Sequence, residues 1–288
     1  MDLMATGGSA VPARDVRTRR VSFDFAARSM ERHISDDLLS SHLLALGSAV
    51  FPEGEDFFVR TVRHYRDDIE DDNLRRQVAG FIGQEAMHAR SHQALNERLA
   101  RLGYPTRFID RFVHVFLGLW ERILPPQVAL AITAALEHYT ATWAEAFLSD
   151  DGAQQGFADN EIRRLFLWHA LEETEHKAVA FDVFQQVSGS DRVRRWVMHV
   201  TTWHFMTGIV LGLLISLARD PSGWSPRRLA ASLRSVRTSP LAAPKVVDRL
   251  RDYYRPDFHP DDHDTTALVA EWRARLTDAS GSVLPAGA

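Results

Sequence analysis

Hydrophobic positions recur every three to four residues through most of this chain, which is the period of an amphipathic α-helix. Aspartates suited to helix N-caps, together with glycine and proline breaks, divide the pattern into separate elements. We therefore predict helices over about 36–68, 71–103, 107–123, 126–149 and 159–188, and three short helices after residue 219. No alternating pattern of useful strand length occurs. The expected fold class is all-α.

Six acidic and histidine residues interrupt the apolar faces of four of these helices. Two helices carry a Glu-x-x-His pair, and each is preceded by a helix with a lone glutamate among apolar positions. Residues three apart lie on one helix face, so both members of a pair project the same way. In chain order the six are Glu55, Glu85, His88, Glu137, Glu173 and His176. This order is typical of four-helix bundles that hold two metal ions.

Buried carboxylates are costly unless they are paired or bind a metal, and the same helix faces carry no Lys or Arg. Two divalent cations would neutralise four glutamates. The alternative is a core of protonated glutamates and pH-sensitive histidines. A donor set rich in carboxylates favours two iron ions, with manganese or a mixed Mn/Fe pair as alternatives, over zinc.

The composition is that of an ordinary globular protein of 288 residues, with a net charge of -4 and no cysteine. It excludes disulfides and thiolate sites, and it does not indicate nucleic-acid binding. Because residues 1–20 lack the apolar stretch of a signal peptide, we expect a cytoplasmic protein. We predict a disordered N-terminus over 1–20 and a single domain over 21–288. Residues from about 190 to 288 would form a helical cover.

The segment from Trp196 to Ala218 is close in length to a membrane span. It contains two histidines, several threonines and two glycines. We therefore favour a helix buried against the bundle, and keep contact of residues 196–218 with a membrane as the alternative.

Three sequence blocks carry a family resemblance: FPEGEDFF at 51–58, FIGQEAMHARSHQALNERL at 81–99 and WHALEETEHKAVAFDV at 168–183. Over roughly residues 20–275 the chain resembles a ferritin-like group of bacterial proteins called predicted metal-dependent hydrolases. The resemblance implies a ferritin-like four-helix bundle with additional C-terminal helices. The family's name also implies hydrolysis.

A second resemblance concerns a third histidine, His169, one turn before Glu173. The spacing His-x-x-x-Glu-x-x-His resembles the ligand set of the p-aminobenzoate N-oxygenase type of di-iron enzymes. It implies seven metal ligands: Glu55, Glu85, His88, Glu137, His169, Glu173 and His176. His92, one turn after His88, would be an outer partner of the site or a plain core histidine. Glu172 and Glu175 would be solvated or outer partners.

Three functions follow from these patterns, in decreasing order of preference. The first is a di-iron oxygenase or oxidase that activates O2 to oxidise a small, hydrophobic organic substrate. The second is a hydrolase that uses a metal-bound hydroxide. The third is iron storage or ferroxidase activity, which the roughly 100 residues after residue 188 disfavour. The expected partners are a small-molecule substrate and O2, and a homo-oligomer is compatible with the sequence.

Overall fold

The computed structural model describes residues 11–25, 33–278 and 282–284. Across these ranges the chain is α-helical and contains no β-strand, apart from two isolated antiparallel bridges, Ser35–Phe157 and Thr277–Val283. The predicted all-α fold class is therefore confirmed.

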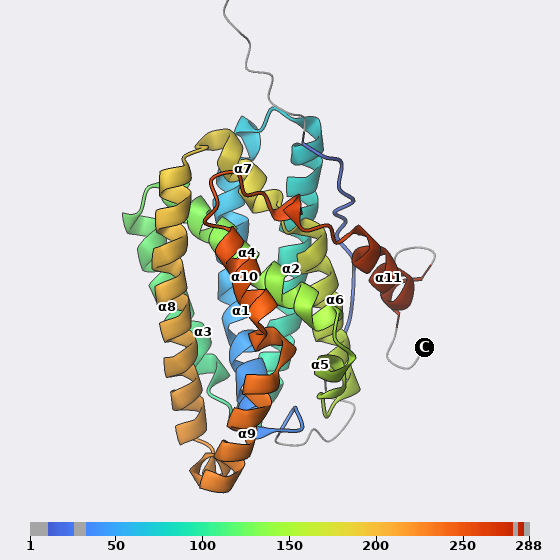
Figure 1. The fold of residues 1–288 in the computed structure, drawn as a ribbon, viewed down its shortest axis with the longest axis vertical. Coiled ribbons are helices and arrows are strands. Elements are labelled where there is room, and N and C mark those ends of the chain that lie inside the picture. The colour runs from blue at the N-terminus through green and yellow to red at the C-terminus, as the bar shows by residue number, and fades with distance from the viewer. Residues whose placement is uncertain (1–10, 26–32, 279–281, 285–288) are drawn as a thin grey trace, which may run out of the picture.

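Long helices packed side by side form a bundle at the centre of the molecule (Figure 1). Helix α3 (Thr106–Ile123) returns the chain along the outside of this bundle, from the end of its second helix to the start of its third. The bundle helices are α1 (Leu38–His64), α2 (Asp72–Arg101), α4 (Pro126–Leu148) and α6 (Asn160–His176), the last extended by α7 (Val179–Val187).

Aspartate side chains begin three of the bundle helices. The carboxylate of Asp37 accepts a hydrogen bond from the Ser40 amide, and Asp71 and Asp159 cap α2 and α6 in the same way. A side-chain acceptor at this position satisfies amides that lack a partner within the helix. Helix α2 ends just before Gly103, whose φ is 98°, a backbone conformation that glycine adopts at little cost. These boundaries agree with those predicted from the sequence.

The helix expected over 159–188 differs from the prediction because it is interrupted. Lys177 and Ala178 separate α6 from α7, directly after His176. Neither residue is a glycine or proline, so the sequence carries no local signal for this break. A short helix, α5 (Asp151–Gln155), also precedes α6 and was not predicted.

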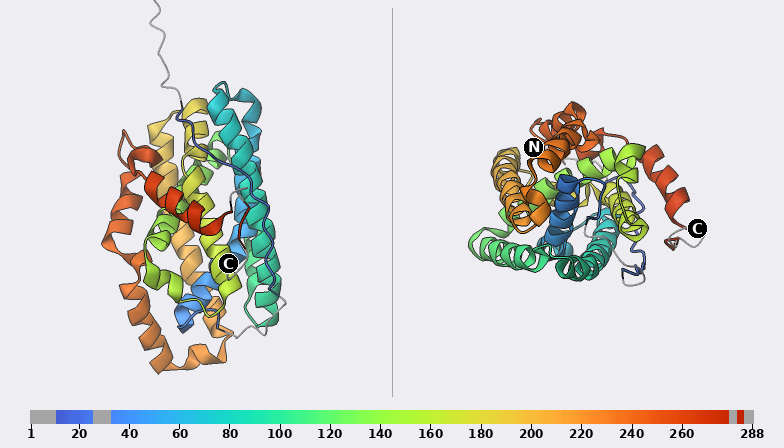
Figure 2. Two further views of the ribbon diagram at one scale, coloured as in Figure 1. Left: turned by 90° about the vertical axis from the view of Figure 1, so that its right-hand side faces the viewer. Right: turned by 90° about the horizontal axis from the view of Figure 1, so that it is seen from below.

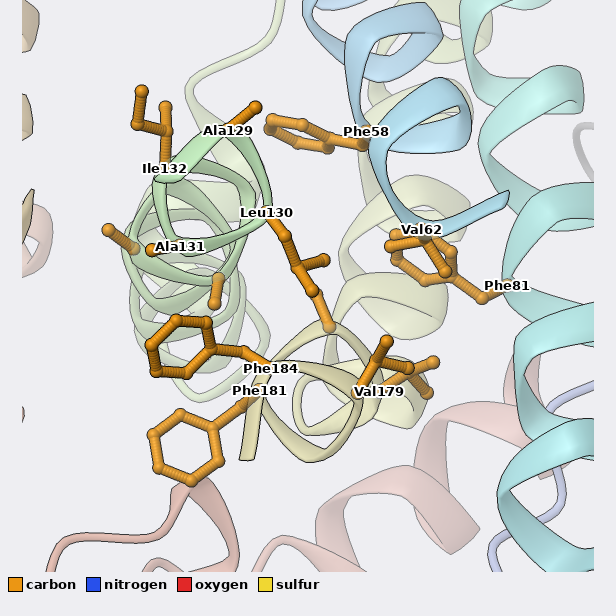
Figure 3. Packing of buried hydrophobic residues seen from close by; sticks show 14 of the residues in the cluster. Phe58, Val62, Phe81, Ala129, Leu130, Ala131, Ile132, Val179, Phe181 and Phe184 are labelled. Atoms are coloured by element: carbon orange, nitrogen blue, oxygen red, sulfur yellow. The ribbon is translucent and has the colours of Figure 1, made fainter. Parts of the chain in front are cut away.

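Apolar residues from four helices close one end of the bundle around the polar centre. The side chains of Phe58 and Val62 (α1), Phe81 (α2), Leu130 (α4) and Phe184 (α7) belong to one buried cluster (Figure 3). They lie on the helix faces that carry the predicted site residues. The burial of these faces positions the site, because each polar residue is a turn or two from a side chain that is fixed in the core.

The tail adds helices to the outside of the bundle (Figure 2). Helix α8 (Asp191–Ala218) is followed by three short helices, as predicted: α9 (Pro226–Thr238), α10 (Pro244–Asp252) and α11 (Thr266–Leu276). Four 3-10 turns complete the described elements: η1 (Arg66–Asp68), η2 (Pro221–Trp224), η3 (Pro240–Ala242) and η4 (Pro260–Asp262). The buried side chains of Tyr253, Phe258 and Trp272 hold the tail against the bundle.

Helix α8 corrects the expectation of a buried helix over 196–218. Among the described residues it alone is long and apolar enough to cross a membrane, but only 17% of its most apolar window is buried. Val197 and Met198 pack into the core, and Gly212 lies against Leu46 of α1. The side chains on the opposite side of α8 are exposed. The length and composition of the helix therefore do not indicate which of its residues pack against the bundle.

The N-terminal residues 11–25, which we call the strap, run along α2. The prediction of a disordered N-terminus covers residues 1–20. Residues 1–10 lie outside the described part of the chain, whereas residues 11–20 are held in place. The Gln77 amide donates to the Pro12 carbonyl at 2.7 Å, and the Gln84 amide donates to the Arg17 carbonyl at 3.2 Å. The strap therefore covers α2 on the stretch that carries site residues.

Candidate metal centre

The four bundle helices direct seven polar side chains towards one point in the core. Helix α6 contributes three of them, α2 two, and α1 and α4 one each. None of the seven is more than 3% exposed. They are Glu55, Glu85, His88, Glu137, His169, Glu173 and His176. The structure thus brings together every site residue named from the sequence, and their role as metal ligands stays a prediction.

One half of the centre surrounds His176. Its Nε2 lies 3.1 Å from Oε1 of Glu85, 3.4 Å from Oε2 of Glu137 and 3.5 Å from Oε1 of Glu173. Ligand atoms of Glu85, Glu137 and His176 all lie within 4.8 Å of one another. Three donors from three different helices therefore converge at the spacing needed around a single ion.

The other half surrounds His88 and His169. Nε2 of His169 lies 3.0 Å from Oε1 of Glu173 and 3.6 Å from Oε1 of Glu55. Nδ1 of His88 lies 3.8 Å from Oε1 of Glu85 and 3.8 Å from Oε1 of Glu173. Glu85 and Glu173 therefore lie between the two halves, each with one carboxylate oxygen within 3.8 Å of histidines on both sides.

Most donor atoms of the centre make no hydrogen bond within the described part of the chain. Buried atoms without a partner are expensive, because they have lost water and gained nothing in return. They are both carboxylate oxygens of Glu55, Glu85 and Glu137, Oε2 of Glu173, Nδ1 of His88 and Nε2 of His176. Oxygen and imidazole donors that converge in this way fit divalent transition-metal ions, so the residues present pass the chemical test for a dinuclear site.

Burial shifts the pKa values of several carboxyl groups of the centre away from their ordinary values. Burial raises the pKa of Glu137 to about 8, and the neighbouring Glu173 adds to the effect. Burial and the charge of Glu85 likewise raise the pKa of Glu55. Burial also opposes ionisation of Glu85, but contact with His176 outweighs it and lowers that pKa. In the metal-free protein burial therefore favours the protonated forms of Glu55 and Glu137, and bound cations would favour their ionised forms instead.

Each histidine of the centre uses its second nitrogen for an outward hydrogen bond. His88 Nε2 contacts Oε2 of Glu172 at 3.0 Å, and His176 Nδ1 contacts Oε1 of Gln84 at 2.9 Å. His169 Nδ1 contacts His92 Nε2 at 2.7 Å, and Ser48 lies behind His92. Such partners select the tautomer and orient the inward nitrogen of a metal-binding histidine. His169 therefore shares the arrangement of the other two, and His92 is its outer partner.

Arg19 of the strap joins the outer partners of two helices. Its guanidinium contacts Glu172 at 2.8 Å and Glu175 at 2.7 Å, and Glu175 contacts the Gln84 amide at 3.0 Å. A continuous buried path thus runs from His88 through Glu172, Arg19, Glu175 and Gln84 to His176. Of the two expectations for Glu172 and Glu175, the structure supports outer partners and not solvated residues, because both are buried, Arg19 contacts both and Arg273 also contacts Glu175.

Sequence reasoning did not identify Arg19, Gln84 or Ser48. Arg19 lies 153 residues from Glu172 in the chain, so no helical spacing connects them. Gln84 directly precedes Glu85, a position that periodicity places beside the ligand face rather than on it. The available signal was that Glu172 and Glu175 have no Lys or Arg three or four residues away on their helix, which leaves room for a partner from a distant segment.

Aromatic rings enclose the centre. The ring of Phe51 lies 4.5 Å from that of His169, Phe81 lies 4.9 Å from His176, and Trp168 lies 4.8 Å from His88, measured between centroids. An apolar wall lowers the local dielectric and strengthens the interaction of the carboxylates with a cation.

Comparison with known proteins agrees with the family inferred from the sequence blocks. The model of the family described as "Predicted metal-dependent hydrolase" matches residues 17–264, a range that contains the seven residues of the centre and Arg19. No curated protein and no solved structure matches the chain. The buried His/Glu clusters are consistent with the metal dependence in that description. The chain belongs to the family of predicted metal-dependent hydrolases.

Proposed function

We propose that this chain is a metal-dependent enzyme whose seven clustered residues hold two divalent ions, with Glu85 and Glu173 between them. The observation that carries the proposal is the set of buried carboxylate and imidazole atoms that lack any hydrogen-bond partner among the described residues. Cations provide the interactions that these atoms otherwise lack. Glu55, His88 and His169 would hold one ion, and Glu137 and His176 the other.

The family description favours hydrolysis as the reaction over the oxidation that we first expected. Bound divalent ions would supply an activated water molecule and polarise the oxygen of an ester, amide or phosphate. The chain's own residues would fix the ion positions through the two central glutamates. Glu172, Gln84 and His92 would orient the three imidazoles, and the aromatic wall would exclude bulk water.

Oxidation with O2 is the second candidate, and burial of the centre favours it. With every ligand at most 3% exposed, a small apolar co-substrate reaches the centre more easily than an ester does. Two pockets on the described surface, one lined by Phe23 and Arg164 and the other by His138 and Arg249, include none of the seven residues. The carboxylate-rich donor set is also typical of di-iron bundles.

The test begins with metal content. We expect about two ions per chain, as in dinuclear bundles, and a large loss of metal in Glu85→Ala and His176→Ala with helical content retained. Glu121→Ala and His64→Ala change exposed residues outside the centre and serve as matched controls. Full metal content in both site variants would show that the proposed centre does not bind the metal.

The reaction is then assigned with one protein preparation loaded separately with Zn(II), Mn(II) or Fe(II). Metal-dependent turnover of an ester, amide or phosphate panel, absent after chelation, supports the hydrolase. Stoichiometric O2 uptake by the Fe(II) protein alone, absent in Glu85→Ala, supports the second candidate instead. A metal-loaded protein with neither activity across both assays would count against catalysis at this centre.

A further inference from the structure

Large exposed apolar side chains gather on one side of the molecule. Among the described residues they belong to α3, to α8 and to residues 224–247. Spacings of three, four and seven residues place them on a single side of each of the two helices. The ten on the helices, which we call the apolar face, are Phe108, Phe112, Val115, Leu119 and Ile123 of α3 and Trp196, Trp203, Val210, Leu211 and Leu214 of α8.

Helices α3 and α8 lie side by side on the bundle (Figure 1). The Trp120 ring of α3 contacts the His204 ring of α8 at 4.9 Å between centroids. Both helices also pack around α1, where Ile109, Ile209 and Leu213 share a cluster with Leu46. The two apolar stripes are therefore parts of one continuous surface, and such surfaces on soluble domains mark interaction sites.

A segment with only positive charges adjoins the apolar face. Residues 221–247 contain Arg227, Arg228, Arg234, Arg237 and Lys245, all exposed, and no aspartate or glutamate. The segment begins at the C-terminal end of α8, where the Arg219 guanidinium lies 5.3 Å from the Phe108 ring centroid of α3. Trp224, 76% exposed, lies between the two regions in sequence. Apolar and cationic surfaces therefore meet at one end of α8.

We propose that the apolar face and residues 221–247 bind the surface of an anionic lipid bilayer. Exposed tryptophans and leucines enter the boundary between headgroups and acyl chains, while arginines attract negatively charged headgroups. Helix α8 lies along the bundle rather than projecting from it (Figure 2), so the contact is lateral and the helix does not cross the membrane. This inference is independent of the reaction at the metal centre.

The charge of the segment distinguishes a bilayer from a second copy of the chain. In a twofold contact the same surface is contributed by both copies. Each copy would then bring a segment with five positive and no negative side chains to that contact. An anionic lipid surface provides the opposite charge in any orientation, and its hydrocarbon covers the tryptophans and leucines.

The test is flotation of the full-length protein with vesicles of phosphatidylcholine alone or mixed with phosphatidylglycerol. We expect binding to the anionic vesicles, weakened by salt, and quenching of tryptophan fluorescence by brominated acyl chains. The quadruple variant R227Q/R228Q/R234Q/R237Q should bind at least about tenfold more weakly. The control R63Q/R66Q/R76Q/R101Q removes four exposed charges from α1, η1 and α2 and should bind normally.

A second variant set tests the apolar face without relying on charge. F112S/W203S/L214S should abolish quenching while circular dichroism remains unchanged. The wild-type quenching experiment keeps the test decisive if that variant fails to fold. Absence of both flotation and quenching in the wild type would overturn the proposal. A dimer that F112S/W203S/L214S converts to a monomer, without lipid binding, would instead identify the face as a contact between copies.

Discussion

At the scale of single residues, the orientation of the histidines is the most informative feature of the centre. His88, His169 and His176 each present one nitrogen to the glutamates and bind a different outer partner with the other. A histidine buried only for packing has no need of this division. Three imidazoles held in this way are pre-oriented, so binding of a cation requires little rearrangement.

Arg19 should control metal affinity although it contacts none of the seven residues. We expect Arg19→Met to weaken metal binding by about 10–100-fold, because it removes the guanidinium from buried Glu172, leaves Arg273 as the one arginine on Glu175 among the described residues, and frees the His88 ring. Arg19→Lys restores the charge but not the forked geometry and should have an intermediate effect. Competition with a fluorescent chelator measures the affinity.

The control for this prediction is the neighbouring Arg17. Its side chain is 78% exposed and pairs only locally, with Asp15, in the described structure. Arg17→Met should therefore leave metal affinity unchanged. Equal affinities for wild type and a folded Arg19→Met protein would show that the buried path from His88 to His176 does not position the ligands.

At the scale of elements, the strap approaches α2 closely where the helix carries glycine. A Cβ added to Gly80 would lie 2.1 Å from the Val16 carbonyl oxygen, and one added to Gly83 would lie 1.8 Å from Oγ1 of Thr18. Glycine is unfavourable inside a helix, so two of them here indicate a requirement for close packing. The glycines bring the strap near enough for Arg19 to reach the outer partners of the centre.

Gly80→Ala should displace the strap. Because the obstructing atom belongs to the backbone of Val16, the new methyl group forces the chain to move, at a cost of about 1–3 kcal/mol of unfolding free energy. Hydrogen exchange at residues 11–25 should become faster than in the wild type. Urea denaturation and exchange measured by mass spectrometry report the two effects.

Gly118→Ala on α3 provides the contrast, because no atom outside its own helix lies within 4 Å of the added Cβ. It should raise the unfolding free energy by about 0.5–1 kcal/mol through helix propensity alone. If Gly80→Ala gave the same increase, the close approach of the strap to α2 would not matter for stability.

Predictions of individual elements succeeded where the controlling signal is local. The capping aspartates Asp37, Asp71 and Asp159 begin their helices as expected, because a cap depends on residues within one turn. The break at Lys177 and the exposed side of α8 were not predicted. Both depend on the packing of neighbouring elements, which the residue spacing within a helix does not indicate.

At the scale of the whole molecule, stability should depend jointly on metal and pH. The pKa of Glu137 is about 8 in the folded protein, against an ordinary 4.5, and burial also raises the pKa of Glu55. Contacts with glutamates outweigh burial and raise the pKa of His88 and His176. Between pH 6.5 and 8 the folded, metal-free protein therefore binds more protons than the unfolded chain at these groups.

The stability of the metal-free protein should therefore fall as the pH rises. Raising the pH from 6.5 to 8 should lower its unfolding free energy by something on the order of 1–2 kcal/mol through Glu137 alone. Urea unfolding in the presence of a chelator measures the change. Glu137→Gln should reduce this change, whereas Glu121→Gln, at an exposed position, should leave it unaltered.

Bound metal should reverse this dependence. Cations favour the ionised glutamates, so proton release assists binding and the stabilisation by metal should increase from pH 6.5 to pH 8. A metal-free protein with the same stability at both pH values would show that its buried glutamates do not retain protons as inferred.

The sequence by itself determined the helical class, most helix boundaries, the family and the seven residues that meet in the core. These follow from the 3.6-residue period of the helix, which places Glu and His on apolar faces, and from the cost of burying carboxylates without cations. The division of the chain into one domain with a C-terminal cover stays a prediction.

Tertiary structure alone decided which atoms are left without partners, which arginine supports the ligands, and which side of α8 faces outward. Arg19 and Glu172 meet across 153 positions of chain, and α3 and α8 come together where both pack on α1. Contacts between distant segments depend on how whole helices pack, and helical periodicity describes only the face that each helix buries.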